Sequence, residues 1–161
     1  MVLCALVVAV LLAVGYGMLR TSIPTDPVSS STLLALYITL SFLLGALSSG
    51  IAGSMGMWIS LRATVRVAAA ATTSLNGALQ TALRSGAVSG LFTVAMSLAG
   101  VGGLFAVINN FVPPGLAPDV WAQRIPYLIV GYGFGASFVA LFAQLGVGIY
   151  TKAADVGADL V

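Results

Sequence analysis

The chain has 161 residues, of which 60% are hydrophobic and only 6% are charged, and its formal net charge is +2. Soluble domains usually carry about 25% charged residues, so this composition excludes an ordinary soluble domain and predicts an integral membrane protein. The chain has no histidine, which excludes imidazole acid–base chemistry and histidine metal ligands from these residues. The small net charge gives no reason to expect nucleic-acid binding.

Four apolar stretches are long enough to cross a bilayer, which takes about 20 helical residues. We place the four spans at about residues 2–19, 32–61, 87–108 and 126–150. Residues 62–86 contain few helix breakers, and they predict either a helix leaving the membrane or a helical hairpin near its surface. The predicted fold class is therefore all-α: one polytopic region of about four transmembrane helices. Trp58 and Trp121 are expected near the membrane surfaces.

Small residues recur at helical spacing in two of these spans. Gly45, Ser49 and Gly53 follow one another at every fourth position in the second span, and Gly131 and Gly135 share this spacing in the fourth. Stripes of this kind let two helix backbones approach closely in lipid. We therefore predict helix–helix contacts at both stripes.

Three charged side chains follow the last span at positions i, i+3 and i+7: Lys152, Asp155 and Asp159. These offsets fall on one face of a helix, where two carboxylates four residues apart repel each other unless a cation lies between them. A Mg²⁺ ion would supply that charge because it prefers oxygen ligands, and lysine is a natural partner for phosphate. The face predicts a site for a metal–phosphate substrate, with a solvated helix end as the alternative.

Two long stretches of the chain resemble the membrane-bound, ion-translocating pyrophosphatases. GYGFGASFVALFAQLGVGIYTKAADVGADLV, residues 131–161, is similar to their fifth membrane helix and the start of their first acidic motif. LLGALSSGIAGSMGMWISLRATVRVAAAA, residues 43–71, is similar to an earlier block. There the family usually carries Arg-Ala-Asn-Val-Arg, and this chain has Thr64 in place of the asparagine.

The resemblance implies a homodimer whose subunits have about sixteen membrane helices. Such proteins hydrolyse pyrophosphate held with Mg²⁺ at the cytoplasmic side and move H⁺ or Na⁺ outward, and some depend on K⁺. Lys152 matches a lysine that holds pyrophosphate, and Asp155 and Asp159 match residues that serve the Mg²⁺–pyrophosphate complex. No catalytic residue is assigned. Gln144 stands where many members carry an arginine at the level of the ion gate, so we expect either a gate-lining role or a hydrogen bond between helices.

The chain departs from the family in one further respect and is much shorter than its members. Val147 interrupts what is usually a run of three glycines. We expect the chain to be an N-terminal piece, or a truncated gene product, that is inactive by itself. The alternative function is a small four-helix membrane protein with a structural or assembly role.

The positive charges predict the orientation, because cytoplasmic connections carry an excess of lysine and arginine. One side has Arg62, Arg66, Arg84 and Lys152, and the other has Arg20 and Arg124. Residues 62–86, Lys152 and both chain ends are therefore predicted to be cytoplasmic. The membrane is expected to be the cell membrane or that of an acidified organelle.

This orientation can be tested in sealed vesicles with single cysteines introduced at Ser74 or Ser85 of a Cys4→Ser variant, which removes the native thiol. An impermeant thiol reagent should label them only from the cytoplasmic side. Labelling only from the opposite side would overturn the orientation.

Overall fold

The fold is all-α in the computed structural model, which describes residues 2–19, 30–112 and 117–160. The elements are α1 (Val2–Val14), its π-helical extension η1 (Gly15–Leu19), α2 (Ser31–Ala71), α3 (Leu75–Asn109) and α4 (Pro118–Asp159). Three of them, α2, α3 and α4, are long and apolar enough to cross a membrane, and Leu3–Met18 is a shorter apolar helix. The predicted all-α, polytopic class is confirmed.

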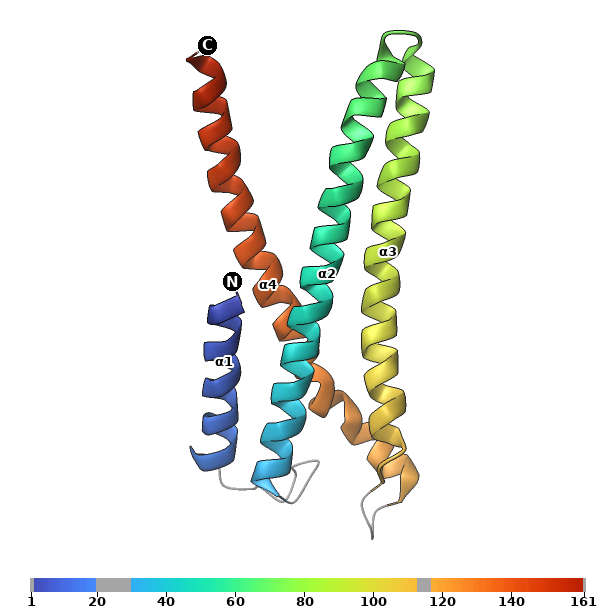
Figure 1. Cartoon of the computed structure of the whole chain (residues 1–161). Helices are drawn as coiled ribbons and strands as arrows, with labels where there is room; N and C mark the ends of the chain where they lie inside the picture. The colour runs from blue at the N-terminus through green and yellow to red at the C-terminus, as the bar shows by residue number, and fades with distance from the viewer. Residues whose placement is uncertain (1, 20–29, 113–116, 161) are drawn as a thin grey trace.

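Helices α2 and α3 form a long antiparallel hairpin (Figure 1). The chain reverses at Thr72 and Thr73, and the Ser74 side chain caps α3 by accepting a hydrogen bond from the Gly77 backbone N–H at 3.0 Å. Residues 62–86 comprise the end of α2, the turn and the beginning of α3, and their position relative to the membrane stays a prediction. Both helices run beyond the predicted span ends, and how much of each lies in the bilayer stays a prediction.

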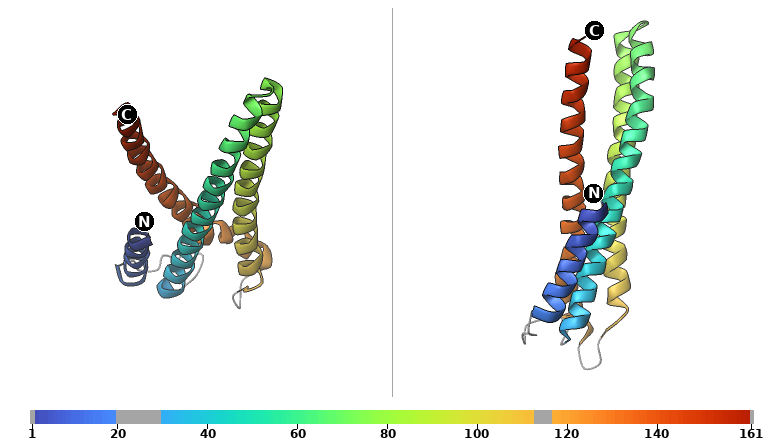
Figure 2. Two further views of the ribbon diagram at one scale, coloured as in Figure 1. Left: turned by 45° about the horizontal axis from the view of Figure 1, so that its top comes forward. Right: turned by 60° about the vertical axis from the view of Figure 1, so that its left-hand side comes forward.

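Helix α4 crosses α2 obliquely and then diverges from it (Figure 1). The first part of α4 lies beside the end of α3, whereas its last part points away from the hairpin, as Figure 2 also shows. The tip of the hairpin and the C-terminal end of α4 lie at the same end of the molecule. Helix α1 packs beside the first half of α2.

Glycines allow the backbones of α2 and α4 to come into close contact where the two helices cross. A Cβ atom added at Gly135 would collide with the Phe42 carbonyl oxygen, and one at Gly131 would collide with the Ile38 carbonyl oxygen. From the other helix, a Cβ at Gly45 would collide with the Tyr132 backbone. The predicted close packing is confirmed at these three glycines. The same stripe ends before Gly53, where an added Cβ would meet no atom within 4 Å.

Polar side chains connect the helices around this crossing. The buried Ser41 hydroxyl donates to the Leu128 carbonyl at 3.1 Å, and the Tyr132 hydroxyl donates to the Met96 carbonyl at 3.2 Å. The Trp121 indole N–H donates to the Ile108 carbonyl at 3.1 Å. Trp121 is only 1% exposed, so the expected interfacial tryptophan is packed inside the chain. The surrounding core comprises Leu34, Ile38, Ile108, Trp121, Ile125 and Leu128.

Replacing Gly135 by alanine should destabilise the protein, because the new methyl group meets a backbone that cannot rotate away. Overpacking of this kind costs about 1–3 kcal/mol. Gly133→Ala is the matched control, since an added Cβ there meets nothing within 4 Å. Thermal unfolding in detergent should separate the two variants; equal midpoints would show that the crossing is not close-packed.

Candidate functional site

The predicted charged face lies on the last turns of α4, which remains helical to Asp159. Lys152 Nζ lies 3.7 Å from Asp155 Oδ2, and the two side chains are 85% and 68% exposed. Asp159, one turn further on, is also exposed. The structure therefore brings the three charges onto one solvent-facing helical surface, as their spacing predicted.

This face has the chemistry of an open binding surface. An exposed ion pair contributes at most about 1 kcal/mol to stability, so the charges are not explained by a need to hold the fold. The described residues contain no group of three or more histidine, cysteine, aspartate or glutamate side chains that could hold a metal ion. Two carboxylates nevertheless fit Mg²⁺, which is commonly bound by one or two carboxylates together with substrate phosphates.

The helical turn of α4 that precedes the charged face, residues 146–148, packs against no other described helix at its glycines. The Thr151 hydroxyl donates to the carbonyls of Val147 and Gly148, at 2.9 and 3.1 Å. An added Cβ at Gly146 or Gly148 would meet no atom within 4 Å, and Val147 itself is 48% exposed. Within the described helices, then, replacement of the middle glycine by valine has no steric consequence.

Gln144 follows Gly135, the last buried residue of α4, by nine positions, and it is exposed. The described helices therefore do not bury its amide, and neither of its two expected roles is tested by this arrangement. Its position toward an ion gate stays a prediction.

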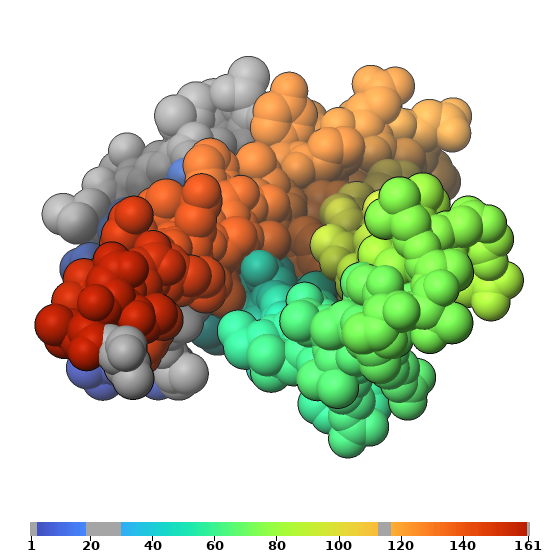
Figure 3. Space-filling view, turned by 90° about the horizontal axis from the view of Figure 1, so that it is seen from above, coloured from blue at the N-terminus to red at the C-terminus, as the bar shows by residue number. Residues whose placement is uncertain are grey.

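The arginines predicted to face the cytoplasm lie at the same end of the molecule as Lys152, but on the hairpin. Seen from this end, the end of α4 and the hairpin are separate masses with a hollow between them (Figure 3). Three arginines, Arg62, Arg66 and Arg84, line one depression between α2 and α3. The sequence placed these three arginines on one side of the membrane but did not predict that both helices contribute to a single depression.

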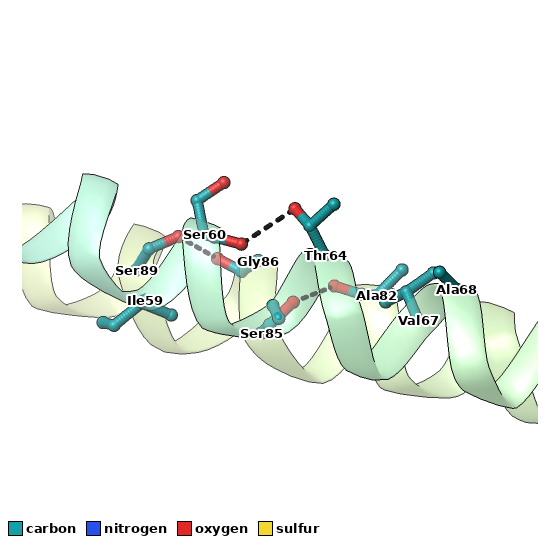
Figure 4. Close-up of a pocket in the computed structure, with 10 residues that line it drawn as sticks. Ile59, Ser60, Thr64, Val67, Ala68, Ala82, Ser85, Gly86 and Ser89 are labelled. Atoms are coloured by element: carbon teal, nitrogen blue, oxygen red, sulfur yellow. Dashed lines mark hydrogen bonds between the residues drawn. The ribbon is translucent and has the colours of Figure 1, made fainter.

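A second groove follows the other side of the α2–α3 seam and is lined by small residues and hydroxyls (Figure 4). Three of its hydroxyls are bound within their own helices: Thr64 donates to the Ser60 carbonyl at 2.9 Å and Ser85 to the Ala82 carbonyl at 2.9 Å. Ser89 likewise donates to the Gly86 carbonyl at 3.0 Å. These three donors are therefore already satisfied and are not available to a polar ligand in the groove.

The fold and the charged face together define an α-helical, multi-pass membrane protein with a cation and two carboxylates at one helix end. The chain belongs to the inorganic H⁺ pyrophosphatase family, whose family model matches residues 1–161. The family resemblance seen at residues 43–71 and 131–161 is thereby confirmed, and the match extends over the whole chain.

Curated relatives agree with this assignment. The chain is 54% identical over 129 residues to pyrophosphate-energized membrane proton pump 3 of Arabidopsis thaliana, covering 80% of this chain and 16% of that protein. It is 49% identical over 159 residues to a K⁺-insensitive pyrophosphate-energized proton pump of Caldanaerobacter subterraneus. That match covers 98% of this chain and 21% of the relative. It is 44% identical over 126 residues to a putative K⁺-stimulated pyrophosphate-energized sodium pump of Bacteroides thetaiotaomicron. That match covers 78% of this chain and 17% of the relative.

The chain spans about a fifth or less of the length of these relatives. No solved structure matches it.

Removing the charges of the α4 face should leave the fold intact, because the ion pair is largely exposed. Lys152→Ala and Asp155→Asn should each change the free energy of unfolding by no more than about 0.5 kcal/mol. Ser41→Ala, which removes the buried hydrogen bond to α4, serves as the positive control, with an expected loss of about 0.6–1.7 kcal/mol. Unfolding midpoints measured in one detergent would contradict the binding interpretation if the charge variants lost as much stability as the control.

Proposed function

We propose that this chain is part of a membrane pump that couples hydrolysis of Mg²⁺–pyrophosphate to the translocation of H⁺ or Na⁺. Its contribution is the start of the pyrophosphate-binding acidic motif on α4. The observation that carries the proposal is the charged face, found on a chain that belongs to the family along all its residues. Family membership favours this function over a structural or assembly role.

Each charged residue has a distinct part in the proposal. Lys152 binds a pyrophosphate oxygen, since an ammonium group forms charge-assisted hydrogen bonds with phosphate. Asp155 and Asp159 hold Mg²⁺, which neutralises the charge of the substrate, orients it and lowers the pKa of an attacking water. The Lys152–Asp155 distance of 3.7 Å allows the lysine to neutralise that carboxylate until the substrate arrives.

The remaining assignments follow from the proposed pump. The protein is an integral, multi-pass membrane protein, and we propose that the Lys152 end faces the cytoplasm and that the full subunit forms a homodimer. The relatives include both proton pumps and a sodium pump, and both K⁺-insensitive and K⁺-stimulated members. Either ion, with or without K⁺, is compatible with the residues of α4. Gln144 is proposed to line the ion gate.

Substitutions at the charged face test this function in the full product of the gene that encodes the chain. Asp155→Asn keeps the size of the side chain but removes its charge, so it should abolish most pyrophosphate turnover and weaken the response to Mg²⁺. Lys152→Ala should mainly raise the pyrophosphate concentration required, by about tenfold or more, because one charge-assisted contact is lost.

Thr151→Ser is the matched control, because serine can keep the hydroxyl that bonds to the Val147 and Gly148 carbonyls. It should hydrolyse pyrophosphate like the parent protein. If the Asp155 and Lys152 variants did so as well at equal expression, the face would be a solvated helix end and the proposed site would be wrong.

A further inference from the structure

The depression that contains the arginines lies between α2 and α3 and has a volume of about 430 Å³. We call it the basic groove; it is lined by Trp58, Ile59, Arg62, Ala63, Arg66, Thr81, Arg84, Ser85 and Val88. No acidic side chain lines it among the residues that the structure describes. Arginine stays charged at any physiological pH, so the groove holds three positive charges from two helices.

One of these guanidinium groups is held in place by an aromatic ring. The Arg62 Cζ atom lies 3.9 Å from the centroid of the Trp58 ring, which is within the range of a cation–π contact. The contact leaves the edge N–H groups of the guanidinium available, and these match phosphate oxygens in a two-point geometry. The groove is thus suited to a phosphate group.

The arginines stand at the boundary between charge-free and charged parts of the hairpin. Arg62 and Arg84 are equally far in sequence from Thr73 in the turn, so the antiparallel helices hold them at similar height. Residues 31–61 of α2 and 85–109 of α3 contain no charged side chain. Trp58, 51% exposed, sits at the same boundary, where tryptophan is enriched in membrane proteins.

On the side of this boundary away from the hairpin turn, exposed apolar side chains continue along both helices. On α2, Ile51 and Met55 precede Trp58 by seven and three positions, and all three are between 41% and 51% exposed. On α3, Val88 and Leu91 follow Arg84 at the fourth and seventh positions and are 56% and 71% exposed. These spacings keep each set on one helical face, so an apolar strip leads from the arginines toward the middle of the helices.

The basic groove is separate from the charged face of α4. Phe42 contacts α4, because its carbonyl abuts Gly135. The step from Phe42 to Arg62 amounts to about five and a half helical turns, which places Arg62 on the opposite side of α2. Arg62 therefore points away from α4, and the end of α4 that carries Lys152 lies apart from the hairpin (Figure 3).

We propose that the basic groove binds the headgroup phosphate of an anionic phospholipid, with the acyl chains lying along the apolar strips of α2 and α3. Charge complementarity selects the anionic headgroup, since three cations line the groove without an acidic side chain. The strips distinguish a lipid from free phosphate, which has no apolar part to bury. Basic pockets between membrane helices at a charged leaflet are known to take such headgroups.

The test uses the full product of the gene, purified in detergent and offered equal amounts of phosphatidylglycerol and phosphatidylcholine. Native mass spectrometry should show phosphatidylglycerol bound with about tenfold preference or more. Arg62→Gln combined with Arg84→Gln should reduce that preference at least tenfold, because each arginine supplies charge-assisted contacts. Lysines at the same two positions should retain an intermediate preference, since they keep the charge but lose the planar donor geometry.

Thr64→Val is the control, because Thr64 lines the hydroxyl-lined groove on the other side of the seam and should leave lipid binding unchanged. Equal retention of the two lipids by the unmodified protein would overturn the proposal. This comparison uses no variant, so it does not depend on whether a substituted protein folds. Undiminished phosphatidylglycerol binding by the double glutamine variant would also overturn it. Displacement of the lipid by an equal concentration of inorganic phosphate would show a free-anion site instead.

Discussion

The arrangement of the chain depends on the backbone contact between α2 and α4. Two helices can approach this closely only where side chains are missing, and Gly45, Gly131 and Gly135 provide the space. The contact fixes α4 in its first half: all its buried residues lie between Trp121 and Gly135. One turn further on, the Phe138 ring still pairs with that of Phe42 at 6.0 Å between centroids, and the helix then diverges from the hairpin and carries the charged face away from the packed region.

Features that depend on local spacing were predictable from the sequence. The helical class follows from apolar composition, and the shared face of Lys152, Asp155 and Asp159 follows from the helical repeat alone. The glycine stripes also predicted where helices meet. They could not predict which helices pair, so the sequence did not show that Gly53 would lie outside the contact.

Features that depend on two distant segments were not predictable in this way. Tryptophan is the residue type expected at a membrane surface, yet Trp121 is buried inside the chain. It is buried because α4 begins beside the end of α3, where the Trp121 indole N–H donates to the Ile108 carbonyl. The basic groove is similar: the spacing of Arg62 and Arg66 shows one helical face, whereas the contribution of Arg84 depends on where the chain reverses. That reversal at Thr72 and Thr73 contains neither glycine nor proline, so no strong turn signal marks it.

The length of α4 has a consequence for the environment of its charges. A helix of 42 residues is about 63 Å long, roughly twice the thickness of the hydrocarbon core of a bilayer. Nine residues of α4 follow the predicted span of residues 126–150, so in that placement the last turns of the helix extend beyond the hydrocarbon. Lys152 and Asp155 can therefore stay hydrated throughout, which removes the solvation penalty that ionised groups would meet within the hydrocarbon. A highly charged, water-soluble anion would reach them without entering the membrane.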